Sequence, residues 1–218
     1  MPVNHSLKLI FIHVPKAAGS TVERFIKDQT GEPWDLWGKY HNDERHYERY
    51  PQSGPVVRLN PDRFGGKPKQ GLYHHLVLED MMNILGHERT ARYHKLAIIR
   101  NPWDRLVSHY EYLRQTGGRA GTENQSFENW FETRSVTPQI LPYLTVDNKV
   151  PADVQLIDFD SFSDEFGRFA GQLGLSWRGE LHEKRSERNH YRHYYSDAMA
   201  TRLADECAAD IDYFGFTF

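Results

Sequence analysis

A short apolar run that passes through a turn of small residues into a helix constrains this fold most. Residues 7–12 (LKLIFI) have the composition of a buried strand, and residues 13–20 form a loop. Residues 21–28 (TVERFIKD) favour a helix that stops near Gly31. A strand–loop–helix start directs backbone N–H groups and the positive end of the helix dipole toward one point. The opening of the chain therefore predicts an anion-binding turn.

The side chains of this turn predict the kind of anion. Gly19 permits close approach of the backbone, Ser20 and Thr21 add hydroxyl donors, and Lys16 adds a positive charge. A nucleoside-triphosphate P-loop carries Gly-Lys-Ser/Thr at the helix start, whereas here Ser20 follows the glycine and the lysine precedes it by three residues. The turn is thus suited to a phosphate-like group without following the ATPase pattern. The alternative is a structural turn with an exposed lysine.

Short apolar runs alternate with helix signals along the rest of the chain. Further strands are expected over residues 71–77, 96–99 and 154–157, and helices over 79–85, from Pro102 onward, over 126–133 and 161–173, and from Ser196 onward. Strands that alternate with helices are typical of a parallel sheet flanked by helices. The pattern predicts the α/β class, and the length of 218 residues suits a single domain over residues 1–218.

A second motif lies at the end of the run 96–99. Arg100 follows this buried strand, Asn101 and Pro102 form a good helix start, and Ser108 lies two turns into the helix. A guanidinium group with a nearby hydroxyl suits a terminal phosphate monoester. An ion pair with a neighbouring carboxylate is the alternative for Arg100. Arg105 is an alternative cation, with an exposed helix position as its simpler interpretation.

Composition limits the class of protein. The formal net charge of −3 argues against a nucleic-acid-binding protein, which usually carries an excess of basic residues. One cysteine, Cys207, excludes an internal disulfide and is expected in the core. The apolar run of residues 7–14 is too short to span a membrane and lacks a signal-peptide cleavage pattern. We therefore expect a cytoplasmic protein without a membrane span; a homo-oligomer is compatible with the sequence.

Taken together, residues 14–21 (VPKAAGST) and 99–108 (IRNPWDRLVS) resemble the carbohydrate sulfotransferase family, in the branch of heparan sulfate 2-O-sulfotransferase and its bacterial relatives. Residues 154–166 and the run from Asn189 to Phe216 fit the pattern more loosely. The resemblance implies a P-loop-like sulfotransferase fold, 3′-phosphoadenosine 5′-phosphosulfate (PAPS) as sulfate donor, and no required metal. It also implies a glycan or another hydroxyl-bearing acceptor.

The resemblance assigns two binding regions for the donor. Arg100 and Ser108 would hold the 3′-phosphate. The 5′-phosphosulfate would lie on the turn residues Lys16, Ala17, Ala18, Gly19, Ser20 and Thr21. The basic residues of a later segment either contact an acidic ligand or lie in a solvated loop; they are Lys184, Arg185, Arg188 and Arg192.

Sulfuryl transfer needs a base for the acceptor hydroxyl, and histidine is the usual base near neutral pH. His74 and His75 end or follow the predicted strand 71–77. In similar 2-O-sulfotransferases, a histidine five residues before an aspartate serves as base, and His75 before Asp80 has that spacing. His74 is the second choice, and packing or metal ligation are the alternatives. Lys16 is the expected stabiliser of the leaving phosphate. The rival functions are a P-loop kinase-like phosphotransferase and a non-catalytic nucleotide-binding protein.

Overall fold

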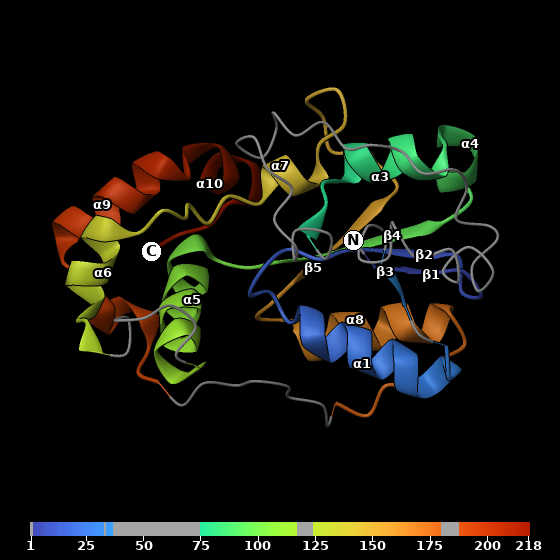
Figure 1. The fold of residues 1–218 in the computed structure, drawn as a ribbon, viewed down its shortest axis with the longest axis horizontal. Helices are drawn as coiled ribbons and strands as arrows, with labels where there is room; N and C mark the ends of the chain where they lie inside the picture. The colour runs from blue at the N-terminus through green and yellow to red at the C-terminus, as the bar shows by residue number, and fades with distance from the viewer. Residues whose placement is uncertain (1, 33, 37–74, 117–123, 180–187) are drawn as a thin grey trace. The chain divides into compact units, whose positions relative to one another are not determined.

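The computed structural model describes residues 2–32, 34–36, 75–116, 124–179 and 188–218 (Figure 1). By its internal contacts the chain divides into two compact units, one in residues 1–98 and 142–181 and the other in residues 99–141 and 182–218. The expectation of a single domain over residues 1–218 stays a prediction.

The first unit is built on a sheet. Among the described residues its strands have the order β3-β1-β2-β4-β5. Their bounds are β1 (Pro2–Asn4), β2 (Leu9–Ile12), β3 (Asp35–Leu36), β4 (His94–Ile99) and β5 (Val154–Asp158). Strands β2 and β4 are parallel, with Ile12 opposite Ala97. This pairing confirms the α/β class and gives the unit a central parallel pair, so that the chain leaves both strands at one edge of the sheet.

Two antiparallel strand pairs extend the sheet beyond this parallel core. Strand β1 pairs antiparallel with both β2 and β3. The connection from β1 to β2 is short, and Lys8 adopts a positive φ of 47° within it. A connection of this length joins only antiparallel neighbours. The sequence pattern predicts no strand before residue 7, because three residues are too few to show an alternation of apolar and polar side chains.

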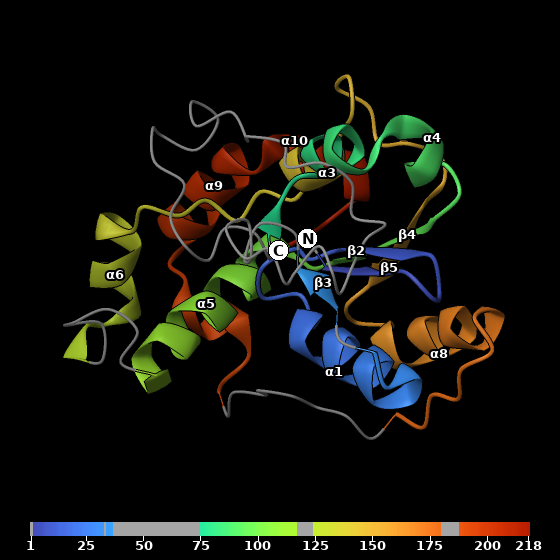
Figure 2. The same ribbon diagram turned by 45° about the vertical axis from the view of Figure 1, so that its right-hand side comes forward.

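Helices cover both faces of the sheet in the first unit (Figures 1 and 2). On one face lie α1 (Gly19–Thr30) and α8 (Phe162–Gln172), and on the other lie α3 (Leu78–Leu85) and α4 (His87–Thr90). The buried stripes of α1 and α8 meet where the rings of Phe25 and Phe166 lie 5.4 Å apart at 78°. Helix α1 ends at Gly31, which has a φ of 67°, so the predicted stop is confirmed.

The predicted strand over residues 71–77 is wrong in the part that the structure describes. Residues 71–74 lie outside the described residues, and residues 75–77 form no strand. Helix α3 begins at Leu78 instead. Leu76 and Leu78 are both buried, so the apolar run reflects burial of a connecting segment rather than pairing in the sheet.

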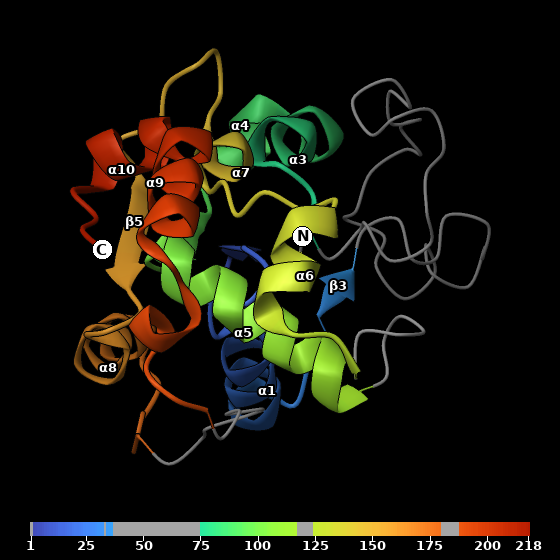
Figure 3. The ribbon, with the colours of Figure 1, turned by 90° about the vertical axis from the view of Figure 1, so that its left-hand side faces the viewer.

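The second unit is helical, and Figure 3 shows α5 together with α6 and α9, both of which contact it. Its helices have the bounds α5 (Pro102–Thr116), α6 (Phe127–Thr133), α9 (Asp197–Glu206) and α10 (Ala208–Phe214), with a 3₁₀ turn η5 (Tyr191–Tyr194). Asn101, Ser126 and Ser196 cap three of these helices by accepting hydrogen bonds from backbone N–H groups. Asn101 and Ser196 are caps that the sequence predicts. Helix α7 (Leu141–Leu144) spans the point where the chain passes from this unit to the first.

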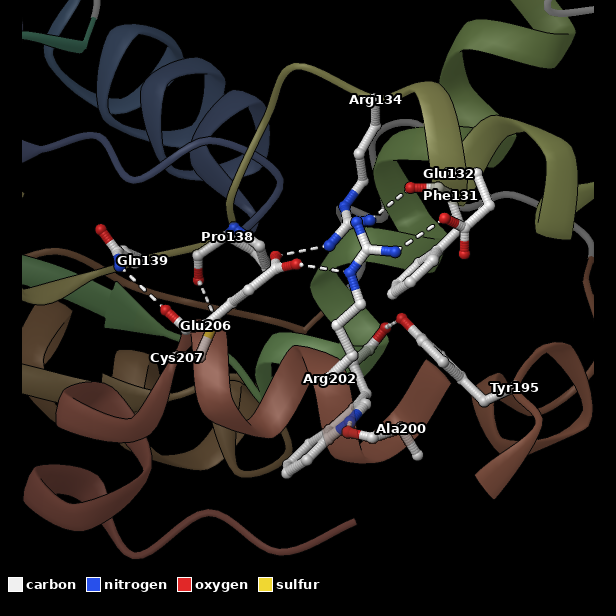
Figure 4. A network of polar contacts seen from close by, with 11 residues as sticks. Phe131, Glu132, Arg134, Pro138, Gln139, Tyr195, Ala200, Arg202, Glu206 and Cys207 are labelled. Atoms are coloured by element: carbon white, nitrogen blue, oxygen red, sulfur yellow. Dashed lines mark hydrogen bonds and ion pairs between the residues drawn. The ribbon is translucent and has the colours of Figure 1, made fainter. Parts of the chain in front are cut away.

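An ion-pair network ties α6 to α9 over the core of the second unit (Figure 4). The guanidinium of Arg134 lies 3.7 Å above the ring of Phe131 and 2.5 Å from a carboxylate oxygen of Glu206. The Arg134 side chain is only 3% exposed. On the outer side, Arg202 pairs with Glu132 at 2.7 Å, where both side chains are about half exposed. Cys207, at the break between α9 and α10, is buried as expected.

Candidate functional site

The loop between β2 and α1 has the backbone of an anion-binding turn. Lys16 and Ala18 adopt positive φ angles of 63° and 55°, in the left-handed region that non-glycine residues rarely occupy. Alternation of left-handed and right-handed residues makes successive backbone N–H groups converge on one point, the arrangement called a nest. Ala18 is also the residue that precedes α1, so these residues adjoin the positive end of the helix dipole. The turn between strand and helix is therefore present, and anion binding by it stays a prediction.

The helix begins two residues earlier than the sequence predicts, so Gly19 and Ser20 belong to it rather than to the loop. Gly19 is the first residue of α1, and Ser20 and Thr21 follow it in the first turn of the helix. Ala17 and Thr21 are buried, whereas Lys16 and Ser20 are half-buried.

Gly19 is required by a neighbouring side chain rather than by its own backbone angles. A Cβ atom at Gly19 would lie 1.9 Å from Nε2 of His13, far inside any tolerated contact. The ring of His13 therefore packs directly on the first residue of α1. Its Nδ1 atom lies 2.6 Å from Oε1 of Glu23, one turn further along the helix.

His75 contacts this turn. Its Nδ1 atom lies 2.8 Å from the backbone carbonyl oxygen of His13. A carbonyl oxygen only accepts, so His75 carries a proton on Nδ1, and in the neutral ring the lone pair is on Nε2. The rings of His75 and His13 meet edge-on with their centroids 4.6 Å apart. The other histidine proposed from the sequence, His74, lies outside the described residues.

Arg100 and Ser108, in the second unit, lie side by side. Nη1 of Arg100 donates to Oγ of Ser108 at 3.3 Å, and both residues are buried. Arg100 also pairs with Asp104 at 2.6 Å, so the carboxylate partner considered from the sequence is present. Asp104 pairs with Arg188 as well. Two guanidinium groups thus converge on one carboxylate beside a serine hydroxyl.

Arg105, the alternative cation, is not an exposed helix residue. Its side chain is buried and donates to the backbone carbonyl of Gln139 at 3.1 Å. Packing within the second unit accounts for this residue. Of the later basic cluster, Lys184 and Arg185 lie outside the described residues, and Arg192 donates to the backbone oxygen of Phe218.

Burial and charge act in opposite directions on Asp104. Burial on its own raises the pKa of this carboxyl group, but the guanidinium groups of Arg100 and Arg188 lower it by more, so the pKa lies below its usual value of 3.8. Asp104 is therefore ionised near neutral pH and holds both arginines in place.

One comparison with known proteins decides the family. The profile of the sulfotransferase family matches residues 1–217. The chain belongs to the sulfotransferase family. The match runs through both units of this sulfotransferase, so one family pattern spans residues of each. Neither the curated proteins nor the solved structures contain a match to the chain.

Two further observations concern the described part of this sulfotransferase. Within it, histidine, cysteine, aspartate and glutamate side chains form no cluster of three or more that could hold a metal ion. No helix in the same residues is long and apolar enough to cross a bilayer.

The sequence does not predict three residues that lie beside the turn at Gly19 or beside Arg100. His13 stands between the strand and the loop, and Glu23 is four residues after Gly19, but neither position by itself indicates a partner. Asp104 is four residues after Arg100, the spacing of neighbouring side chains on a helix, and this spacing was the available signal.

Proposed function

We propose that this sulfotransferase moves a sulfuryl group from PAPS to a hydroxyl group of a carbohydrate, with His75 as the base. The observation that carries the proposal is the hydrogen bond from His75 Nδ1 to the carbonyl of His13, because it joins a histidine with Nε2 as its basic nitrogen to the anion-binding turn. The donor supplies an electrophilic sulfur atom that carries a good leaving group, the 5′-phosphate.

The reaction is a single displacement at sulfur, in which the acceptor hydroxyl is the nucleophile. Nε2 of His75 takes the proton of the acceptor hydroxyl as the acceptor oxygen forms its bond to sulfur. The bond between sulfur and the 5′-phosphate oxygen breaks in the same displacement, and its electron pair stays on the phosphate. The products are a sulfate ester, adenosine 3′,5′-bisphosphate and a protonated His75.

In the same displacement, negative charge develops on the leaving phosphate. Lys16, the nest at residues 16–18 and the first turn of α1 stabilise the charge that grows on the 5′-phosphate. Arg100 and Ser108 hold the 3′-phosphate. This division of the donor between the two groups of residues rests on the family resemblance of residues 14–21 and 99–108.

The nature of the acceptor and the location of the protein complete the proposal. The carbohydrate acceptor rests on the family resemblance of residues 14–21 and 99–108. We propose a cytoplasmic location because the chain has a single, buried cysteine and therefore forms no internal disulfide.

Label transfer tests the function directly. The protein is incubated with PAPS carrying radioactive sulfate and a panel of oligosaccharides, lipids and phenols, and the product that takes the label is identified. We expect label on an oligosaccharide. Label on a phenol or a lipid would replace the proposed acceptor class, and absence of transfer to every member would overturn the enzyme activity.

A thermal-shift comparison separates the rival functions. Adenosine 3′,5′-bisphosphate is expected to raise the melting temperature more than ATP with Mg²⁺ does, since stabilisation follows affinity for the folded state. The reverse order would favour a kinase-like phosphotransferase. Stabilisation by the bisphosphate without any label transfer would favour a non-catalytic nucleotide-binding protein.

A further inference from the structure

The side chain of His13 contacts three parts of the first unit at once. Its ring packs on Gly19, at the start of α1. Its Nδ1 atom bonds to Glu23, and its ring edge meets the ring of His75 at an interplanar angle of 75°. The backbone carbonyl of the same residue accepts the hydrogen bond from His75. One residue thus joins the phosphate turn, the first helix and the histidine proposed as base.

The hydrogen bond to Glu23 restricts rotation of the His13 ring. The two side chains are 12% and 19% exposed, so the pair is shielded from competing water. At 2.6 Å the contact is a short hydrogen bond between the imidazole and a carboxylate oxygen. Glu23 itself is fixed on α1, where its backbone carbonyl accepts a hydrogen bond from the Trp34 indole at 2.7 Å.

His13 is badly placed to act as the base. Its Nδ1 atom is engaged by Glu23, and its Nε2 atom occupies the space that a Cβ of Gly19 would need. Both ring nitrogens of His13 therefore face residues of α1. His13 therefore acts on the reaction through another residue.

We propose that His13, locked by Glu23, is a positioning residue that fixes both the tautomer and the ring angle of His75. This inference rests on the proposed function, because it gives a purpose to the orientation of the base. The carbonyl of His13 holds the proton on Nδ1 of His75 and leaves Nε2 as the basic nitrogen. The His13 ring limits rotation of the His75 ring about its own bond to Cβ.

Loss of the contact between Glu23 and His13 is expected to lower kcat more than it weakens binding of the donor. Catalysis by a positioned base depends on the alignment of reacting atoms within about 1 Å. A rotated His75 ring would present the wrong nitrogen to the acceptor. The phosphate turn, in contrast, holds its anion through backbone N–H groups and Lys16, which do not depend on the angle of the His75 ring.

The test uses Glu23→Met, which keeps the side-chain volume and helix propensity but removes the acceptor. We expect kcat to fall about tenfold while the Kd for adenosine 3′,5′-bisphosphate changes less than about twofold. Glu23→Gln keeps an acceptor oxygen and should recover most of the rate. Asp28→Asn removes a charge from the exposed side of the same helix and serves as the matched control, with unchanged kcat.

Nitrogen NMR of ring-labelled histidine gives a readout that a purely structural role would leave unchanged. In the unaltered protein and in Glu23→Gln, His75 is expected in the tautomer with the proton on Nδ1. In Glu23→Met, the released His13 ring no longer limits rotation of the His75 ring, which can then turn away from the carbonyl of His13, so a mixture with the Nε2-protonated tautomer is expected. Should Glu23→Met not fold, Glu23→Ala tests the same loss, and the melting temperature of each variant shows which one folds.

The outcomes separate this inference from the proposed function. An unchanged His75 tautomer and an unchanged kcat in folded Glu23→Met would overturn the positioning role and leave the sulfotransferase activity intact. A changed tautomer in a protein that transfers no label would support the positioning contact and overturn the proposed function.

Discussion

One carboxylate oxygen of Asp104 lies 2.7 Å from Nε and 2.6 Å from Nη2 of Arg100. The other oxygen pairs with Arg188. Asp104, four residues after Arg100 and in the first turn of α5, therefore sets the orientation of the guanidinium proposed to bind the 3′-phosphate. Because of the same contact, the stability of the second unit is expected to depend on the charge of Asp104.

Asp104→Asn is expected to reduce the free energy of unfolding by about 2 kcal/mol near neutral pH, since it leaves two arginines without their counter-charge. Burial raises the pKa of Asp104, and the two arginines lower it by more, so its folded-state pKa lies below 3.8. As pH falls, the unfolded chain takes up the proton first. The stabilisation is therefore present above the unfolded value and is lost as pH falls through the folded one.

Urea denaturation of both proteins from about pH 7 down to about pH 3 checks this expectation. The difference between the two free energies should shrink at the acid end. Asp28→Asn, an exposed carboxylate on α1, supplies the baseline. A difference that stays constant over the whole pH range would contradict the assigned pKa direction.

Gly19→Ala is expected to destabilise the protein by about 1–3 kcal/mol, because the new Cβ would meet the His13 ring at 1.9 Å. The control is Gly171→Ala in α8, where a Cβ meets nothing within 4 Å. There the substitution should stabilise by roughly 0.5–1 kcal/mol. Thermal denaturation measures both, and equal effects at the two positions would show that the His13 ring moves aside at little cost.

Lys16→Ala is expected to lower kcat roughly a hundredfold or more without loss of folding, because one charged donor to the leaving phosphate is removed. Lys27, exposed in the last turn of α1, gives the matched control Lys27→Ala. Label transfer under saturating donor gives both rates. A Lys16→Ala rate equal to that of the control would eliminate the proposed role of Lys16.

The thiol of Cys207 is expected to resist modification in the folded protein. Burial, and then the nearby charge of Asp210, raise the pKa of Cys207 to about 12. The thiolate that reacts is therefore scarce at about pH 8, and the sulfur is also shielded from solvent. A disulfide reagent that releases a coloured thiol should react slowly in buffer and at once in denaturant. Rapid reaction in buffer would show that the break between α9 and α10 opens readily.

Glu206→Ala is expected to cost about 2–3 kcal/mol, since it leaves the buried guanidinium of Arg134 without its 2.5 Å partner. Glu132→Ala breaks the Arg202 pair, whose glutamate is 56% exposed, and should change stability by less than about 0.5 kcal/mol. Urea denaturation of the two variants distinguishes a buried pair from an exposed one on the same helices. Similar losses in both would mean that the network acts as one unit.

Local features of this protein could be predicted from the sequence because they depend on near neighbours. The strand–loop–helix start, the stop at Gly31, and the caps Asn101 and Ser196 each involve residues within about four positions of one another. The turn that holds Lys16 and Gly19 belongs to this class. The strand expected over residues 71–77 is absent from residues 75–77, the part that the structure describes, because an apolar run records burial and does not say what covers it.

The sequence by itself determined the α/β class, the turn between the first apolar strand and its helix, and the family. Only the tertiary structure decided which side chains meet there. His75 reaches the carbonyl of His13 across 62 positions of chain, and Arg188 reaches Asp104 across 84. Such pairs depend on how the packed elements bring distant segments together, and no local periodicity or capping preference encodes that distance.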